Sequence, residues 1–160
     1  MKIKGIIEED FVNYKLPCLY ISLGSCDWKC CYESNIPVSV CQNSNLAQSK
    51  DIDVSIDEIF NRYISNPISE AIVIGGLEPF KQFDDVYCLI KFFRDNNCSD
   101  TFIIYTGYYE YEIFEQIKKL KPLKNIILKV GRYIPNQQPH YDEILGIKLV
   151  SDNQKGVIIC

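Results

Sequence analysis

The chain has 160 residues, of which 47% are hydrophobic and 24% charged, the composition of an ordinary globular protein. This length fits one domain with a substantial core. The formal net charge of −4 argues against nucleic acid as a partner, because binding to phosphates depends on Lys and Arg. No apolar run approaches the roughly 18–20 residues needed to span a membrane, so we expect no membrane association either.

Cysteine content narrows the class of protein further. Acidic residues near the N-terminus stand where a signal peptide has its apolar core, which predicts a cytoplasmic protein, where disulfides are rare. Eight cysteines in that compartment indicate metal binding or catalysis more than cross-links. Of the later cysteines, Cys88 is expected to be a small buried residue of a helix, whereas Cys98 and Cys160 carry no local pattern.

The first half of the chain predicts two strands, a long loop and a helix. The strands cover residues 2–11 and 18–23. Residues 25–50 show no periodicity, and an ordered segment of this length is usually functional. Ser55-Ile56-Asp57-Glu58 has the form of a capping box, and it opens a helix with apolar residues on one face: Ile56, Ile59, Phe60 and Tyr63.

The second half alternates apolar strands with amphipathic helices. In chain order we predict a strand, a helix, a strand, a helix and three further strands: 71–74, 84–96, 101–105, 111–120, 125–130, 144–149 and 156–159. Continuous apolar runs are typical of strands buried on both faces of a parallel sheet. The alternation therefore favours an α/β fold with a mainly parallel sheet.

The residues that suggest chemistry follow the predicted strands. The clustered cysteines come after residues 18–23, Gly75–Pro79 follows the next apolar strand, and Thr106-Gly107 and Gly131-Arg132 follow the two after that. Ligands bind outside the carboxyl ends of the strands in such sheets, and a glycine pair lets the backbone approach a ligand closely. These positions predict one site.

Four cysteines, Cys26, Cys30, Cys31 and Cys41, lie within the long loop. Thiolates suit soft metals and iron–sulfur clusters. The paired C-x2-C spacing of many zinc sites is absent, although a structural zinc on all four stays possible, and no C-x-x-C redox pair is present. An iron–sulfur cluster held by three cysteines would leave one iron open to a second molecule.

The motifs resemble those of the radical S-adenosylmethionine (SAM) superfamily. Cys26–Cys30 resembles the start of its C-x3-C-x2-C motif, and Cys41-Gln42-Asn43 is similar to the end of that motif in activases of glycyl-radical enzymes. Gly75–Pro79 resembles the GGEP element with one inserted residue. Tyr105–Tyr108 and Ser151–Lys155 are similar to the YTGY and S-x-N-Q-R segments of anaerobic ribonucleotide reductase activating proteins.

The sequence departs from that pattern at the third cysteine. Glu33 stands where the compact motif has its third cysteine. We take Cys41 as the third ligand and residues 31–40 as an insertion, with Cys31 as the alternative. Val40 replaces an aromatic residue before the third cysteine.

The resemblance implies the fold and the cofactor-binding residues. We expect residues 1–160 to form a single partial (β/α) barrel with a half-open sheet, because a full barrel needs about 250 residues. Residues 25–50 would be the cluster loop. A [4Fe–4S] cluster would be held by Cys26, Cys30 and Cys41, and SAM would meet residues at the strand ends: Gly75, Gly76, Glu78, Pro79, Thr106 and Asn153. We expect Glu78 to be structural, and Thr106 and Asn153 fit turn formation or capping equally well.

The resemblance also implies an activity and partners. It implies reductive cleavage of SAM to a 5′-deoxyadenosyl radical, which would install a glycyl radical on an enzyme such as anaerobic ribonucleotide reductase, with reduced flavodoxin or ferredoxin as electron donor. Partner contacts could come from Tyr and Arg residues, which are enriched at interfaces: Tyr108, Tyr109, Tyr111, Arg132 and Tyr133. The alternatives are a radical SAM enzyme acting on another peptide or small molecule, and a non-catalytic iron–sulfur or zinc protein.

Overall fold

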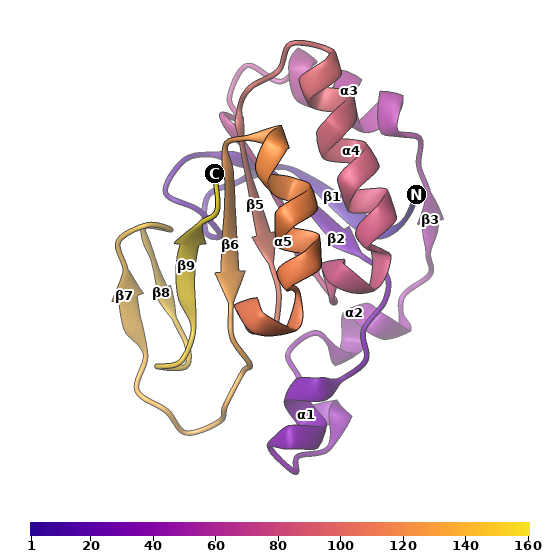
Figure 1. The fold of residues 1–160 in the computed structure, drawn as a ribbon. Helices are drawn as coiled ribbons and strands as arrows, with labels where there is room; N and C mark the ends of the chain where they lie inside the picture. Colours follow the sequence, from indigo (N-terminus) through magenta and orange to yellow (C-terminus); the bar gives the residue numbers. More distant parts are fainter.

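The computed structural model describes all of residues 1–160 and is built on one seven-stranded sheet (Figure 1). The strand order is β3-β1-β2-β4-β5-β6-β9. Strands β2, β4, β5 and β6 are parallel to their neighbours in this series, and β1, β3 and β9 are antiparallel at the sides. The strands are β1 Lys2–Asp10, β2 Cys18–Leu23, β3 Ile52–Asp53, β4 Ala71–Gly76, β5 Thr101–Tyr105, β6 Ile126–Val130 and β9 Lys155–Ile158. This mainly parallel, half-open α/β sheet confirms the predicted fold class and is consistent with a partial barrel.

Three helices lie against one face of the sheet (Figure 1). They are α3 Ile56–Ser65, α4 Phe83–Asp95 and α5 Phe114–Leu120. The α3 helix begins as predicted, because the Ser55 hydroxyl accepts a hydrogen bond of 3.1 Å from the Glu58 N–H, which satisfies one of the free donors at a helix start. The apolar faces of the three helices pack on the sheet in a core of 22 buried residues.

Alternation along each strand creates two cores, one on each face of the sheet. In β4, Ile72 and Ile74 join the helix-side core, whereas Ala71 and Val73 join a second cluster of eight buried residues. That second cluster also contains Leu145 and Leu149, from a hairpin of β7 His140–Asp142 and β8 Ile147–Leu149. The hairpin thus covers part of the inner face, which explains why the central strands are mainly apolar on both of their faces.

Three expectations about local structure differ from what is observed. The cysteine-rich loop is not irregular throughout, because it contains α1 Lys29–Glu33, a 3-10 turn at Val38–Val40 and α2 Ser44–Gln48. The strand expected at 144–149 begins only at Ile147. The helix expected from residue 111 begins at Phe114, after a separate 3-10 turn at Glu110–Glu112. Each element is too short to produce a periodic pattern.

The prediction for Cys88 was wrong, because its side chain is exposed. The buried positions of α4 are Val86, Leu89, Ile90 and Phe93, and residue 88 falls on the opposite side of the helix. A small apolar residue in an amphipathic helix does not by itself reveal its face.

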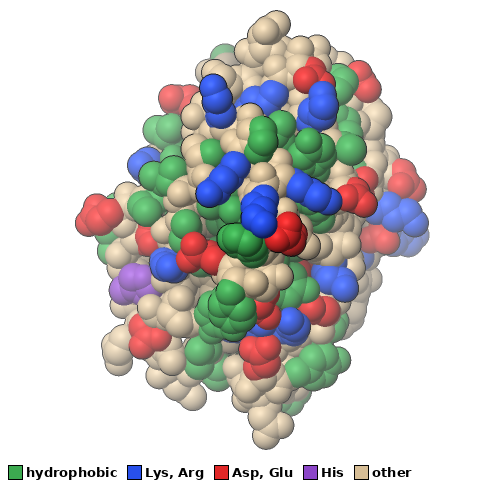
Figure 2. All heavy atoms as spheres, viewed as in Figure 1, with side chains coloured by type: hydrophobic (Ala, Val, Ile, Leu, Met, Phe, Trp, Pro, Cys, Tyr) green, Lys and Arg blue, Asp and Glu red, His purple; other side chains and the backbone are tan.

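The helical face carries mixed charge. Figure 2 shows Lys and Arg side chains interspersed with acidic and hydrophobic ones on this face. No helix in the structure has the length and apolar character to cross a bilayer.

Candidate functional site

A cavity of about 680 Å³ opens at the carboxyl ends of the parallel strands. Its volume falls within the range of about 300–1,000 Å³ that is common for pockets binding small organic ligands. The structure brings most of the predicted site residues to its wall: Cys26, Cys30, Cys31, Cys41, Gly76, Glu78 and Thr106. Gly75, Pro79 and Asn153 do not line it. Segments up to 80 residues apart in sequence therefore meet at one place.

The cysteine loop is fixed at the cavity by a tight turn and by the β4 end. The Ser25 carbonyl accepts a hydrogen bond of 2.7 Å from the Glu78 N–H, and the Trp28 N–H donates to Cys26 Sγ at 3.3 Å. Trp28 has a φ of 60°, a left-handed conformation that costs a bulky residue about 1–3 kcal/mol and that is concentrated at functional sites. The helix α1 begins directly after it.

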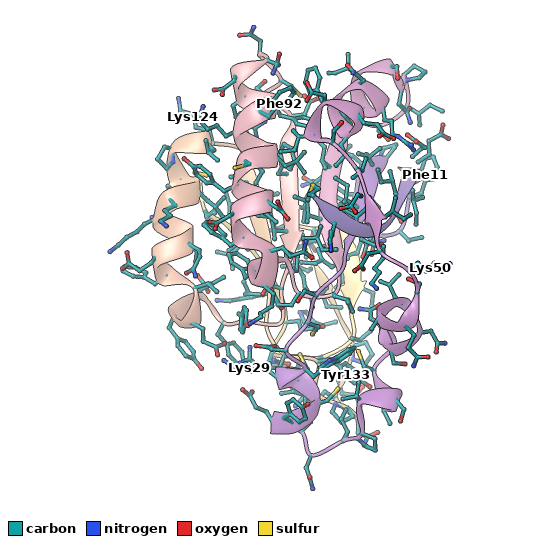
Figure 3. The ribbon with its side chains drawn as sticks, turned by 90° about the vertical axis from the view of Figure 1, so that its right-hand side faces the viewer. Phe11, Lys29, Lys50, Phe92, Lys124 and Tyr133 are labelled. Carbon is teal, nitrogen blue, oxygen red and sulfur yellow. The ribbon has the colours of Figure 1, made fainter.

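Cys30 lies against the glycine that follows β5. A methyl group placed on Gly107 would be 2.9 Å from Cys30 Sγ, so the absence of a side chain at residue 107 gives the sulfur its space. Figure 3 shows Lys29, the neighbour of Cys30, at the same end of the molecule as Tyr133, with Phe92 and Lys124 at the other end. The cysteine loop therefore sits over the strand ends, as predicted.

Burial shifts the thiol pKa values upward. Desolvation raises the pKa of Cys26 to about 12, and burial also raises the pKa of Cys30, although Arg132 and the Tyr133 backbone oppose that shift. These thiols are therefore protonated at neutral pH. Binding of a metal or a cluster would release their protons.

The two candidates for the third ligand lie side by side. Cys31 is 2% exposed, and its thiol pKa is raised by burial and then by the neighbouring Cys41. No three His, Cys, Asp or Glu side chains are close enough to hold a metal ion, so ligation requires the cysteine side chains to turn toward one another. The donors lining this side are soft thiols, which fit an iron–sulfur cluster; Cys41 as third ligand stays a prediction.

The glycine turn is tied to both neighbouring segments. Gly76 has a φ of 80°, in the region that favours glycine. Its N–H donates to the Tyr20 hydroxyl at 2.7 Å, and its carbonyl accepts from Asn43 Nδ2 at 2.6 Å. Asn43 belongs to the Cys-Gln-Asn segment of the cluster loop, so this bond joins two of the predicted motifs. A methyl group at Gly75 would lie 2.7 Å from the Tyr20 hydroxyl.

Glu78 cross-links the ends of β4 and β5. It is 6% exposed and accepts hydrogen bonds from the Thr106 hydroxyl at 2.7 Å, the Gly107 N–H at 2.9 Å and the Phe80 N–H at 3.1 Å. Burial raises its carboxyl pKa, and these hydrogen bonds oppose the shift. The contacts fit the structural role expected for Glu78, with Pro79 opening the following turn. The Thr106 hydroxyl also accepts a hydrogen bond of 3.0 Å from the Tyr108 N–H. This bond fits the turn-forming role that was one of the two expected for Thr106.

Asn153 does not line the cavity and is bonded to neighbouring chain segments. Its Nδ2 donates to the Arg132 carbonyl at 3.0 Å and to the Tyr109 hydroxyl at 3.2 Å, and its Oδ1 is buried without a partner. These bonds hold the 151–155 segment to the chain that leaves β6.

Arg132 is not a surface residue, contrary to its proposed place in a docking rim. It is 3% exposed, and its guanidinium lies 5.4 Å and 5.1 Å from the ring centres of Tyr108 and Tyr109. Tyr111 is 77% exposed and stacks on Tyr109, so this part of the expected rim is accessible.

Sequence reasoning missed Lys129 as a cavity residue. Lys129 lines the cavity, is half-buried and pairs in register with Tyr105. Burial lowers its pKa to about 8, and no carboxylate lies within ion-pair distance. One feature of the sequence could have identified Lys129: it is the single charge inside the otherwise apolar strand IILKV. Its side chain faces the inner side of the sheet.

Comparison with known proteins identifies a family for this chain. Residues 17–154 match the family described as the 4Fe-4S single cluster domain, and no curated protein matches the chain. The matched range includes all four loop cysteines, the glycine turn and the cavity-lining strand ends. Because the match covers most of the chain and the thiols gather at the strand ends, we conclude that the chain belongs to the 4Fe-4S single cluster domain family.

Proposed function

We propose that this chain is a radical SAM enzyme in which Cys26, Cys30 and Cys41 hold a [4Fe–4S] cluster and SAM occupies the adjoining cavity. The observation that carries the proposal is that the loop cysteines and the glycine turn line the same cavity of about 680 Å³. Membership of a 4Fe-4S domain family supports the cluster. The cavity supplies room for an organic molecule next to it.

A cluster held by these cysteines would supply one electron, taken from reduced flavodoxin or ferredoxin, for cleavage of a carbon–sulfur bond of SAM to methionine and a 5′-deoxyadenosyl radical. In the proposed reaction that radical takes a hydrogen atom from a backbone glycine of a partner such as anaerobic ribonucleotide reductase. The products would be methionine, 5′-deoxyadenosine and a glycyl radical on the partner.

The protein's own groups bind, orient and shield. The thiolates of the loop hold the cluster, and the Glu78 cross-link to Thr106 and Gly107 fixes the geometry of two strand ends. The bond from Asn43 to Gly76 keeps the loop next to the glycine turn. This division of labour, in which cofactors carry the chemistry and the protein positions them, is general.

One anaerobic experiment tests the proposal. The protein is reconstituted with iron and sulfide, reduced with dithionite and given SAM, and 5′-deoxyadenosine is measured by chromatography and mass spectrometry. We expect product from wild type and from Cys88→Ala, whose thiol is exposed on α4, and none from Cys26→Ala or Cys30→Ala. A full cluster without any product would exclude a radical enzyme, and retention of zinc alone would favour a structural metal site.

A second candidate is a radical SAM enzyme that acts on a small anionic molecule. Lys129 favours it, because a half-buried cation without a counter-ion in the cavity wall is stabilised by an anionic ligand. This second candidate would be supported if formation of 5′-deoxyadenosine required an added carboxylate compound and did not require a glycyl-radical partner.

A further inference from the structure

Glu33, the residue at the position of the third cysteine in the compact motif, is bound to a buried arginine 99 residues away. Its two carboxylate oxygens accept hydrogen bonds of 2.9 Å and 3.0 Å from Nε and Nη2 of Arg132. This is a two-point contact between a planar guanidinium and a carboxylate, which fixes orientation as well as distance. Glu33 is thus held outside the cavity, whose wall it does not form.

The Arg132–Glu33 pair belongs to a linear, neutral set of four charges that runs from Lys29 through Glu112 and Arg132 to Glu33. Arg132 Nη2 also binds Glu112 at 2.7 Å, and Glu112 binds Lys29 at 2.9 Å. The two cations and the two carboxylates balance. The inner pair is buried, because the Arg132 and Glu112 side chains are 3% and 15% exposed, and removal of one partner from such a pair leaves an uncompensated charge. The outer members, Glu33 and Lys29, are 51% and 44% exposed, so Glu33 contributes through its two-point contact with the buried guanidinium.

Both ends of α1 take part in this set. Lys29 and Glu33 are its first and last residues and, four positions apart, lie on the same side of a helix. Glu112 follows β5 and Arg132 follows β6, so the set joins the helix that carries Cys30 to two strand ends. The Asp27 carboxylate adds a contact of 2.5 Å from the Tyr108 hydroxyl.

We propose that Glu33 and Arg132 are positioning residues that latch α1 onto the strand ends and thereby present Cys26 and Cys30 at the cavity. In this proposal Glu33, at the position of the compact motif's third cysteine, binds Arg132 instead of the cluster. The third thiolate then comes from Cys41, later in the same loop. The inference that the latched cysteines are cluster ligands rests on the proposed function; the latch itself does not.

The test measures thiol accessibility in the metal-free full-length protein. Each cysteine is alkylated under reducing conditions, and its rate is followed by peptide mass spectrometry. In Glu33→Gln we expect Cys26 and Cys30 to react about tenfold faster, which corresponds to about 1.4 kcal/mol in the opening equilibrium. The buried Cys18 and Cys98 report global unfolding, and their rates should not change.

Two variants serve as comparisons. Arg132→Lys keeps the charge but loses the two-point contact, so its rates should lie between those of wild type and Glu33→Gln. Arg62→Gln removes an exposed ion pair with Glu58 and Glu8 and should leave every rate unchanged. Unchanged rates for Cys26 and Cys30 in Glu33→Gln, or an equal rise at all buried cysteines, would overturn the latch.

Cluster loading then separates the latch from the proposed function. After reconstitution we expect Glu33→Gln to lose iron to a chelator several-fold faster than wild type. If the alkylation rates change as expected and wild type nevertheless binds no cluster, the latch stands and the proposed function fails. If wild type binds a cluster and Glu33→Gln holds it equally well, the positioning role is refuted.

Discussion

Replacing Gly107 by alanine tests whether Cys30 holds a cluster in the position observed. The added methyl group would lie 2.9 Å from Cys30 Sγ and 3.6 Å from a Glu78 oxygen. Ordinary contact begins at 3.4 Å, so the sulfur must move by the difference, about 0.5 Å. Gly107 is not among the residues with positive φ, and its backbone therefore accepts alanine without strain.

The cost depends on whether the sulfur is free to move. Overpacking of a fixed group costs about 1–3 kcal/mol, equal to roughly 5-fold to 150-fold in an equilibrium constant. In the metal-free protein Cys30 can change rotamer, which relieves most of the clash. We therefore expect a small change in the melting temperature of the metal-free variant and a loss of cluster affinity of at least about 5-fold.

The assay is anaerobic reconstitution followed by chelator competition, with iron and sulfide counted per chain and the reduced cluster followed by EPR. Gly5→Ala is the matched control, because nothing lies within 4 Å of a methyl group there. A folded Gly107→Ala protein with wild-type iron content and an unchanged EPR spectrum would refute the placement of Cys30 as a ligand beside residue 107.

Three further predictions concern the third ligand, a buried lysine and a helix cap. Cys41→Ala should lose the cluster and Cys31→Ala should keep it, as measured by iron content; the reverse result would assign Cys31. Burial depresses the Lys129 pKa to about 8 from 10.5, so wild-type stability should rise with pH between these values. Lys129→Met should be more stable by about 3 kcal/mol at pH 7, and a difference in urea denaturation of metal-free protein that does not shrink toward pH 10 would contradict burial as the cause. Ser55→Ala removes the bond to the Glu58 N–H and should destabilise the protein by about 1 kcal/mol in the same assay, with no effect on iron content.

The sequence alone predicts the central strands well. Residues 71–74, 101–105 and 125–130 are mainly apolar runs, in which only Thr101, Asn125 and Lys129 are polar, and β4, β5 and β6 occupy nearly the same positions. Such runs have few alternatives in a short α/β chain, because both faces must be buried. The cap at Ser55 is equally local, since donor and acceptor are three residues apart. The meeting of motifs at one edge follows from the common direction of parallel strands.

The arrangement inside the cluster loop required the tertiary structure. The elements α1 and α2 are each five residues long, and helices this short owe their stability to packing and not to their own sequence. The contact between Glu33 and Arg132 joins residues 99 positions apart, and no local pattern encodes it. Local sequence therefore determined the central strands and the residues at their ends. The tertiary structure decided that Glu33 contacts Arg132, that Cys31 lies beside Cys41 and that Lys129 faces the cavity, because these contacts join segments that are distant in sequence at one edge of the sheet.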